Sequence, residues 1–282
     1  MKLSEKKLFL MDMDGTLYLS ENLFDGSLDF LRTVREIGGR YVFLTNNSSR
    51  GTDSYIGKMA RLGIETTEED YLTSADAAIS MLDRSDRYYV CGTTSLERQL
   101  REAGFDLAET AAAEDPFGRG YDYPDGASKA LDGVTALLLG YDTELTYRKL
   151  EECCILLNRG VRYYATHPDM VCPTWYGSAP DCGSVIEMLA TATGRRPERI
   201  YGKPRPDMAF AAMKKFGASP EETCLVGDRV YTDIACGVNA GIDTVMVLSG
   251  EGTREDIEKY GYEPTYVVED IKELYRMIKA GE

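Results

Sequence analysis

Runs of apolar residues separated by longer segments of helical periodicity constrain the fold of this chain more than any other feature. Strands that are buried on both faces read as nearly continuous apolar runs, whereas half-exposed strands alternate. The intervening segments carry apolar residues at helical spacing, as Leu28, Leu31 and Val34 do. The pattern predicts an α/β fold in which helices cover both faces of a parallel sheet. The predicted strands are Leu8–Met11, Tyr41–Leu44, Tyr88–Cys91, Val134–Leu139, Val161–Ala165, Cys224–Val226, Thr244–Leu248 and Thr265–Val268.

Polar residues follow several strands at the point where each strand ends. In an open parallel sheet the carboxyl ends of the strands meet at one edge, and ligands bind there. If these strands are neighbours, carboxylates, a hydroxyl and an ammonium converge at that edge. The segments are Asp12–Thr16 after the first strand, Thr45–Asn47 after the second, Gly202–Pro204 after the run Arg199–Tyr201, and Gly227–Arg229 after Cys224–Val226, with Asp233 shortly beyond.

The acidic turn Asp12-Met13-Asp14-Gly15 favours phosphoryl chemistry assisted by a divalent cation. Carboxylates packed together repel unless a cation joins them, and Mg²⁺ takes few protein carboxylates while keeping several waters. One carboxylate can attack phosphorus, and the other can transfer protons. Lys203 and the Thr45 hydroxyl would surround the phosphoryl group. Taken singly, these residues have simpler interpretations. Asp14 could cap a helix instead of transferring protons, and Lys203 could be a solvated surface lysine.

Taken together, the four strand-end segments resemble the four motifs of the haloacid dehalogenase (HAD) superfamily. The match is closest to its NagD-like, p-nitrophenylphosphatase subgroup (subfamily IIA), which inserts a large α/β cap between the second and third motifs. Residues 81–182 are accordingly predicted to form this cap, and residues 1–80 and 183–282 a Rossmann-like hydrolase core, although the helix at 184–193 could belong to either. The motifs are Asp12-Met-Asp-Gly-Thr, Leu44-Thr-Asn-Asn-Ser, Gly202-Lys-Pro-Arg-Pro and Gly227-Asp-Arg-Val-Tyr-Thr-Asp.

The resemblance implies the catalytic and metal-binding residues. Asp12 is the expected nucleophile and Asp14 the expected general acid/base. Mg²⁺ is the expected cofactor, bound by Asp12, Asp228 and the backbone carbonyl of Asp14. Asp233 would orient Lys203 or a water on the metal from behind these ligands.

The same resemblance implies residues that hold the substrate. Thr45, Asn46 and Lys203 would bind the phosphoryl group, and Asn47 would support their loop.

A loop in the predicted cap supplies further candidates for substrate contact. His167, the only histidine of the chain, occupies a position that is more often Asn in this subgroup. It could touch the leaving group, or it could simply hydrogen-bond backbone. The following segment, residues 168–181, resembles the specificity loop of the cap, so Trp175 and Tyr176 could stack on a substrate or pack beneath the cap.

Composition limits the partners and the location. Asp and Glu (47) outnumber Lys and Arg (32), which gives a net charge of −15, and no basic patch is evident, so nucleic acid is not an expected partner. No apolar stretch approaches the roughly 18 residues that span a bilayer, and the run ending at Asp12 is too short for a signal-peptide core. Seven cysteines without a Cys-x-x-Cys pair favour a reducing, cytoplasmic setting.

These observations predict a Mg²⁺-dependent phosphomonoesterase that acts on a small phosphorylated metabolite, such as a nucleotide or sugar phosphate, through an aspartyl-phosphate. The alternatives are a phosphotransferase or mutase of the same superfamily and a non-catalytic protein that binds a phosphorylated metabolite. The resemblance also implies a possible homodimer formed through the cap.

Overall fold

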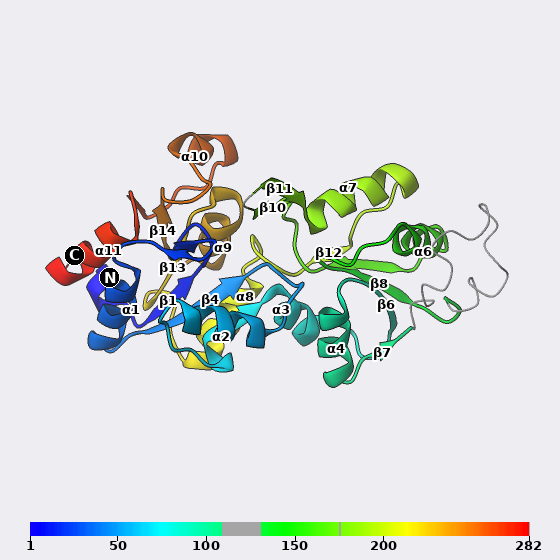
Figure 1. The fold of residues 1–282 in the computed structure, drawn as a ribbon, viewed down its shortest axis with the longest axis horizontal. Coiled ribbons are helices and arrows are strands. Elements are labelled where there is room, and N and C mark those ends of the chain that lie inside the picture. The colour runs from blue at the N-terminus through cyan, green and yellow to red at the C-terminus, as the bar shows by residue number, and fades with distance from the viewer. Residues whose placement is uncertain (109–130, 175, 282) are drawn as a thin grey trace. The chain divides into compact units, whose positions relative to one another are not determined.

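The computed structural model describes residues 1–108, 131–174 and 176–281. These residues form two compact units, each with its own parallel sheet and helices (Figure 1). Unit 1 comprises Met1–Asn46, Thr52–Ala77 and Gly202–Glu282, and unit 2 comprises Asn47–Gly51 and Ala78–Tyr201. The prediction of an α/β fold is confirmed.

The sheet of unit 1 has six parallel strands in the order β15-β14-β13-β1-β4-β5. The chain therefore starts in the middle of the sheet and winds outward on both sides, as in doubly wound folds. The strands are β1 (Leu8–Met11), β4 (Arg40–Thr45), β5 (Tyr71–Thr73), β13 (Thr223–Gly227), β14 (Asp243–Val247) and β15 (Tyr266–Val268).

Helices cover both faces of this sheet because successive side chains of a buried strand point to opposite faces. Phe9 and Met11 of β1 share one apolar cluster with α1, α2 and α11, whereas α8 contacts β1 and β5, and α9 contacts β14. The helices of unit 1 are α1 (Ser27–Glu36), α2 (Thr52–Arg61), α8 (Asp207–Phe216), α9 (Ala235–Ala240), α10 (Arg254–Tyr260) and α11 (Ile271–Ala280), with α3 (Ser74–Met81) running into unit 2. Short elements complete the unit: the hairpin β2 (Tyr18–Leu19) and β3 (Asn22–Leu23), two 3₁₀ turns at Leu3–Glu5 and Glu68–Asp70, and a π-helical turn at Val230–Ile234.

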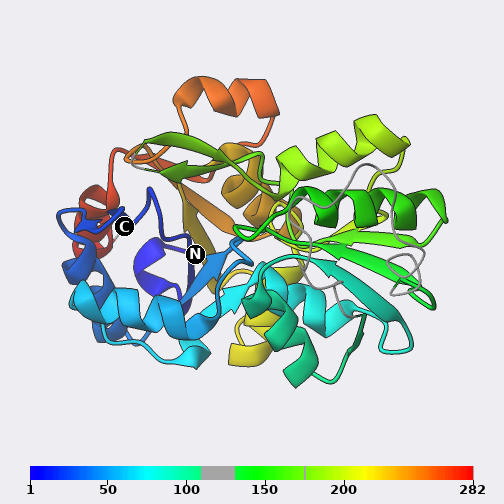
Figure 2. The same ribbon diagram turned by 45° about the vertical axis from the view of Figure 1, so that its right-hand side comes forward.

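The sheet of unit 2 has five parallel strands in the order β12-β9-β8-β6-β7. Helices α6 and α7 lie on one face, where they share an apolar cluster with Tyr89, Leu137 and Tyr163, and α4 lies on the opposite face (Figure 2). The elements are β6 (Arg87–Cys91), α4 (Thr94–Glu102), β7 (Asp106–Leu107), β8 (Ala136–Leu139), α6 (Tyr147–Asn158), β9 (Arg162–Ala165), α7 (Cys182–Thr193) and β12 (Arg199–Ile200), with an antiparallel hairpin of β10 (Val171–Thr174) and β11 (Gly177–Pro180) before α7.

The boundary between the two units differs from the predicted one. We expected the second domain to end at Cys182, with the helix at 184–193 open to either domain, and the run Arg199–Tyr201 to be a strand of the core sheet. Instead, α7 packs on α6, and β12 pairs in parallel with β9, with Arg199 opposite Tyr164. Both elements therefore belong to unit 2, which continues to Tyr201. The local apolar pattern predicts a strand correctly but does not say which sheet the strand joins.

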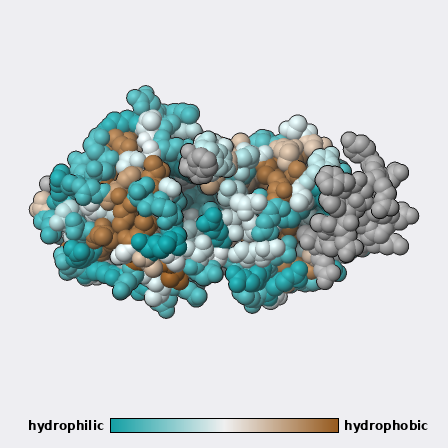
Figure 3. Space-filling view, in the orientation of Figure 1, coloured by the Kyte–Doolittle hydropathy of each residue, from teal (hydrophilic) through white to brown (hydrophobic). Residues whose placement is uncertain are grey.

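The face of the molecule in Figure 3 is mostly hydrophilic, and hydrophobic side chains gather there in separate patches. Among the described residues, no helix has the length and apolar character needed to cross a bilayer.

Candidate active site

The carboxyl ends of β1 and β13 bring together the two acidic motifs of unit 1. The strands are adjacent and in parallel register, with Met11 opposite Val226, and the Asp12 N–H donates to the Val226 carbonyl at 2.8 Å. Asp228 follows one residue after β13, and Asp233 lies on the π-helical turn that comes next. One carboxylate oxygen from each of Asp12, Asp228 and Asp233 lies within 4.8 Å of the other two. Of the four predicted carboxylates, those of Asp12, Asp228 and Asp233 therefore converge at this edge of the sheet.

Lys203 lies at the centre of this cluster. Its Nζ donates to Asp12 Oδ1 at 2.6 Å, to Asp233 Oδ1 at 2.6 Å and to the Leu44 carbonyl at 3.1 Å. Only 3% of the Lys203 side chain is exposed. The reading of Lys203 as a solvated surface lysine is therefore wrong, because a buried ammonium with two carboxylate partners is part of the site.

Asn46 fixes the backbone of Lys203. Its Oδ1 accepts the Lys203 N–H at 2.8 Å, and its Nδ2 donates to the Lys203 carbonyl at 3.0 Å. This pair of hydrogen bonds joins the end of β4 to the segment that carries Lys203, although the two segments are far apart in sequence. We expected Asn46 to hold the phosphoryl group, and the structure gives its amide this second, positioning task.

The remaining predicted residues take up varied positions. Thr45 is the last residue of β4 and is buried. Asn47 belongs to unit 2, where its Oδ1 accepts hydrogen bonds from the Ser49 N–H at 2.9 Å and the Ser49 hydroxyl at 2.7 Å, and its role in supporting the phosphate-binding loop stays a prediction. The Asp14 side chain is 59% exposed, and its Oδ1 lies 3.8 Å from Lys58 Nζ.

Asp228 has one oxygen that the protein engages and one that it leaves open. Its Oδ2 accepts the Glu251 N–H at 2.7 Å, whereas its buried Oδ1 has no hydrogen-bond partner within the described parts of the chain. Glycines line this carboxylate closely: a Cβ at Gly250 would lie 2.0 Å from Oδ2, and one at Gly15, where φ is +83°, would lie 2.5 Å from it. Hard divalent cations bind carboxylate oxygens. The acidic cluster offers several, one of which has no partner among the residues that the structure describes, so the residues fit Mg²⁺.

Burial and mutual repulsion shift the titration of the cluster. Desolvation, with the charges of Asp233 and Asp228, raises the pKa of Asp12 to about 8 although Lys203 opposes the change. Desolvation and Asp233 likewise raise the pKa of Asp228 to about 7. Burial disfavours the charged form of Lys203, but Asp12 and Asp233 outweigh it and raise the pKa of the ammonium above its ordinary value. With three carboxylates ionised, one ammonium leaves the cluster two negative charges in excess, which a divalent cation would balance.

The segment after β14 is a part of the site that the motif analysis missed. Gly250 and Glu251 enclose Asp228, and the Ser249 hydroxyl donates to the Gly15 carbonyl at 2.8 Å. The signal was available, since this Gly-rich segment directly follows the predicted strand Thr244–Leu248.

The predicted cap residues lie in unit 2. The His167 side chain is fully buried, near Asp169 and Asp181. Its contact with a substrate stays a prediction. Tyr176 is 64% exposed at the tip of the hairpin, and Trp175 lies outside the described residues.

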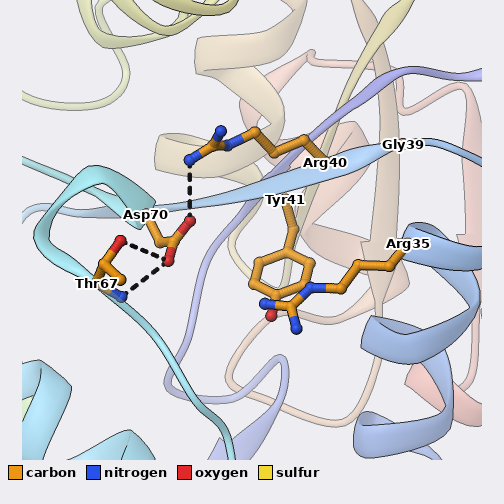
Figure 4. A pocket seen from close by; sticks show the side chains of 6 residues that line it. All are labelled: Arg35, Gly39, Arg40, Tyr41, Thr67 and Asp70. Carbon is orange, nitrogen blue, oxygen red and sulfur yellow. Dashed lines mark hydrogen bonds and ion pairs between the residues drawn. The ribbon is translucent and has the colours of Figure 1, made fainter.

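A pocket of about 410 Å³ opens elsewhere in unit 1, at the start of β4 (Figure 4). Arg40, at the opposite end of this strand from Thr45, contributes to its lining. Its polar groups bond to one another: Arg40 Nη2 lies 3.3 Å from Asp70 Oδ1, and Asp70 accepts the Thr67 N–H at 2.9 Å. The pocket is thus separate from the acidic cluster.

Comparison with known proteins gives the family. Residues 9–106 match the haloacid dehalogenase-like hydrolases, and residues 200–274 match a second family described as HAD-hydrolase-like. The 5′-nucleotidase YutF of Bacillus subtilis is 30% identical over 270 residues, which cover 95% of this chain and 96% of that protein. This chain belongs to the haloacid dehalogenase-like hydrolases.

Solved structures agree with this family. A 4-nitrophenylphosphatase from Thermotoga maritima has a TM-score of 0.83 and 37% identity, covering 97% of this chain and 98% of that one. A glycerol phosphate phosphatase from Mycobacterium tuberculosis in complex with magnesium has a TM-score of 0.83 and 28% identity, covering 99% of this chain and 80% of that one. The predictions of the HAD family and its p-nitrophenylphosphatase-like subgroup are confirmed, and the predicted phosphatase class is the one that these relatives carry in their names.

Proposed function

We propose that this HAD hydrolase cleaves phosphate monoesters of small metabolites, with Asp12 as the nucleophile. The observation that carries the proposal is the buried Lys203 ammonium, which lies 2.6 Å from both Asp12 and Asp233 beside a third carboxylate, Asp228. A cation fixed against the nucleophile is in place before substrate arrives. It can therefore stabilise charge on a transferring phosphoryl group without further reorganisation.

The first half of the reaction transfers the phosphoryl group to the enzyme. A carboxylate oxygen of Asp12 forms a bond to phosphorus as the bond from phosphorus to the ester oxygen breaks. Asp14 gives its proton to the departing alkoxide, which leaves as an alcohol. Its exposed side chain suits this task, because a group at the solvent edge of the site can exchange protons with water.

The second half restores the enzyme. Asp14, now ionised, takes a proton from a water molecule that attacks the phosphorus of the aspartyl-phosphate. The bond between phosphorus and Asp12 breaks, and the carboxylate of Asp12 and inorganic phosphate are released. Thr45 and Lys203 hold the phosphoryl oxygens through both steps.

Mg²⁺ is the proposed cofactor, and Asp12, Asp228 and the backbone carbonyl of Asp14 would hold it. Bound there, the ion would neutralise charge on the phosphoryl oxygens and on the acidic cluster. Asp233 uses Oδ1 for Lys203 and Oδ2 for the Arg229 N–H at 3.1 Å. Both oxygens are engaged, which supports the role of orienting Lys203 over that of holding a water on the metal.

The substrate class follows from the relatives. Those named above carry the names of a 5′-nucleotidase, a 4-nitrophenylphosphatase and a glycerol phosphate phosphatase, so we propose a small phosphomonoester with an alcohol leaving group. Unit 2 is the proposed cap domain of this hydrolase. A homodimer through the cap and a cytoplasmic location stay predictions.

Phosphate release tests the proposal. The wild-type protein, Asp12→Asn and Asp14→Asn are compared on p-nitrophenyl phosphate and on a panel of nucleotides, sugar phosphates and glycerol phosphates with Mg²⁺. We expect no turnover from Asp12→Asn. We expect Asp14→Asn still to be phosphorylated by the nitrophenyl ester, whose leaving group needs no proton, but to lose most multiple turnover because Asp14 also takes the proton of the attacking water. Near-wild-type turnover by Asp12→Asn would refute the nucleophile, and phosphate that appears on an added sugar acceptor instead of in solution would indicate a phosphotransferase.

A further inference from the structure

Three buried residues of unit 2 form a second cluster of metal-ligand type. His167 follows β9, Asp169 lies two residues later, and Asp181 is the N-cap of α7. Asp169 Oδ2 lies 3.8 Å from His167 Nδ1, and Asp181 Oδ1 lies 3.6 Å from His167 Nε2. One ligand atom of each residue lies within 4.8 Å of the other two.

The imidazole of His167 is the unusual member of this cluster. None of the side chain is exposed, and neither ring nitrogen has a hydrogen-bond partner in the part of the chain that the structure describes. A buried polar group without a partner costs about 1–3 kcal/mol, and two buried carboxylates close together repel. A cation bound to one ring nitrogen would satisfy that nitrogen and balance the charge of the carboxylates, while the other ring nitrogen keeps its proton.

We propose that His167, Asp169 and Asp181 bind a divalent metal ion of the zinc type. Imidazole nitrogen and carboxylate oxygen are ordinary ligands of Zn²⁺, at about 2.0–2.2 Å. Ligand atoms around a tetrahedral ion with these distances lie about 3.4 Å apart, close to the 3.6 Å between Nε2 and Asp181. Asp169 has to turn inward to complete the set, and a water would fill the fourth position.

The imidazole separates this site from the magnesium site of unit 1. Mg²⁺ binds oxygen ligands and keeps several waters, whereas imidazole suits zinc and other late transition metals. The acidic cluster around Asp12 contains no histidine, since His167 is the only one in the chain. The two sites therefore prefer different ions.

The position of the cluster in the fold indicates a structural role for the metal ion. His167 precedes the β10–β11 hairpin, and Asp181 follows it. The base of the hairpin is already tied by the Asp181 N–H to the Met170 carbonyl at 3.1 Å and by the Gly183 N–H to the Asp169 carbonyl at 2.7 Å. A metal ion would join the end of β9 to the start of α7 and fix the hairpin between them.

Zinc uptake by the full-length protein tests the site. The protein is produced without a histidine tag, saturated with Mg²⁺, incubated with Zn²⁺ and desalted, and the zinc retained per chain is measured by mass spectrometry. We expect one zinc per chain for the wild type, and loss of that zinc in His167→Asn, Asp169→Asn and Asp181→Asn. The matched control, Asp228→Asn, alters the other carboxylate cluster and should retain the zinc.

The single histidine provides a test that needs no variant. In a spectrum that correlates the imidazole protons with their nitrogens, zinc should shift the one set of histidine signals and leave one nitrogen without a proton. Wild-type protein that takes up no zinc would overturn the proposal, and protons on both ring nitrogens would then show that a proton holds the cluster. Retention of the zinc by His167→Asn would overturn it as well.

Discussion

Replacing Asp12 by Asn should stabilise the metal-free protein while it removes the activity. The Asp12 carboxylate is confined with Asp228 and Asp233 in a buried cluster, and its pKa is raised from 3.8 to about 8. The folded protein therefore favours the uncharged form of this side chain. Asn has the same shape and never carries the charge, so the variant avoids a cost that catalysis imposes on the wild type.

The size of the effect follows from the two pKa values. They differ by about four, and each pKa unit corresponds to about 1.4 kcal/mol, so ionising Asp12 costs the folded protein at most about 6 kcal/mol. The charge and hydrogen bond of Lys203 are already contained in this value, because they lower the pKa of Asp12, and relaxation and water entry in the metal-free site reduce the cost of the charge further. We expect a net gain of about 1–3 kcal/mol, or several degrees in Tm.

The pH dependence of stability provides a separate test of whether Asp12→Asn stabilises the protein. Because the folded pKa of Asp12 lies above the unfolded value, the wild type binds more protons when folded. Its stability therefore falls as the pH rises from about 4 to about 8. The Asn variant lacks this slope, so its advantage should grow across that interval and level off above pH 8.

Thermal unfolding in chelator, followed at several pH values between 5 and 9, measures the effect. Asp53→Asn, at an exposed position in the first turn of α2, is the matched control and should change the stability by less than about 1 kcal/mol. Saturating Mg²⁺ should then reverse the order, because it binds the wild type more tightly than the variant. An Asp12→Asn protein that is less stable than the wild type in chelator at pH 8 would refute the reasoning.

Three further predictions concern the same site. Mg²⁺ has to displace protons from Asp12 and Asp228, whose pKa values are about 8 and 7. The affinity for Mg²⁺ should therefore rise up to about tenfold per proton and pH unit between pH 6 and 8. Calorimetry in two buffers of different ionisation enthalpy counts the protons released, and pH-independent binding would contradict this prediction. Gly250→Ala places a Cβ 2.0 Å from Asp228 Oδ2 and should weaken Mg²⁺ binding more than about tenfold, whereas Gly57→Ala, whose Cβ meets no atom closer than 3.9 Å, should bind normally; equal affinities would argue against the close packing. Lys203→Met should lower kcat about 10²-fold or more, and a change confined to KM would show that the ammonium only binds the substrate.

Much of the fold was predictable because local apolar patterns determine local structure. Phe9 and Met11 belong to a run with no polar residue, which is the signature of a strand buried on both faces, and each expected run did form a strand. The four motifs, in their order along the chain, were enough to identify the family by resemblance, and the shared edge of parallel strands explains why their polar residues meet. In this way the sequence by itself determined the α/β class and the acidic residues that gather in unit 1.

Other features depended on contacts between distant segments. Arg199 and Ile200 have the local pattern of a strand, but only the pairing with β9 places them in unit 2. Asn46 reads as a phosphate-binding residue, and only the tertiary structure shows its amide bonded to the backbone of Lys203. The burial of His167 between Asp169 and Asp181 was equally invisible, because a turn and a hairpin separate these residues along the chain. Burial and long-range pairing are properties of the assembled sheets, and so only the tertiary structure could decide them.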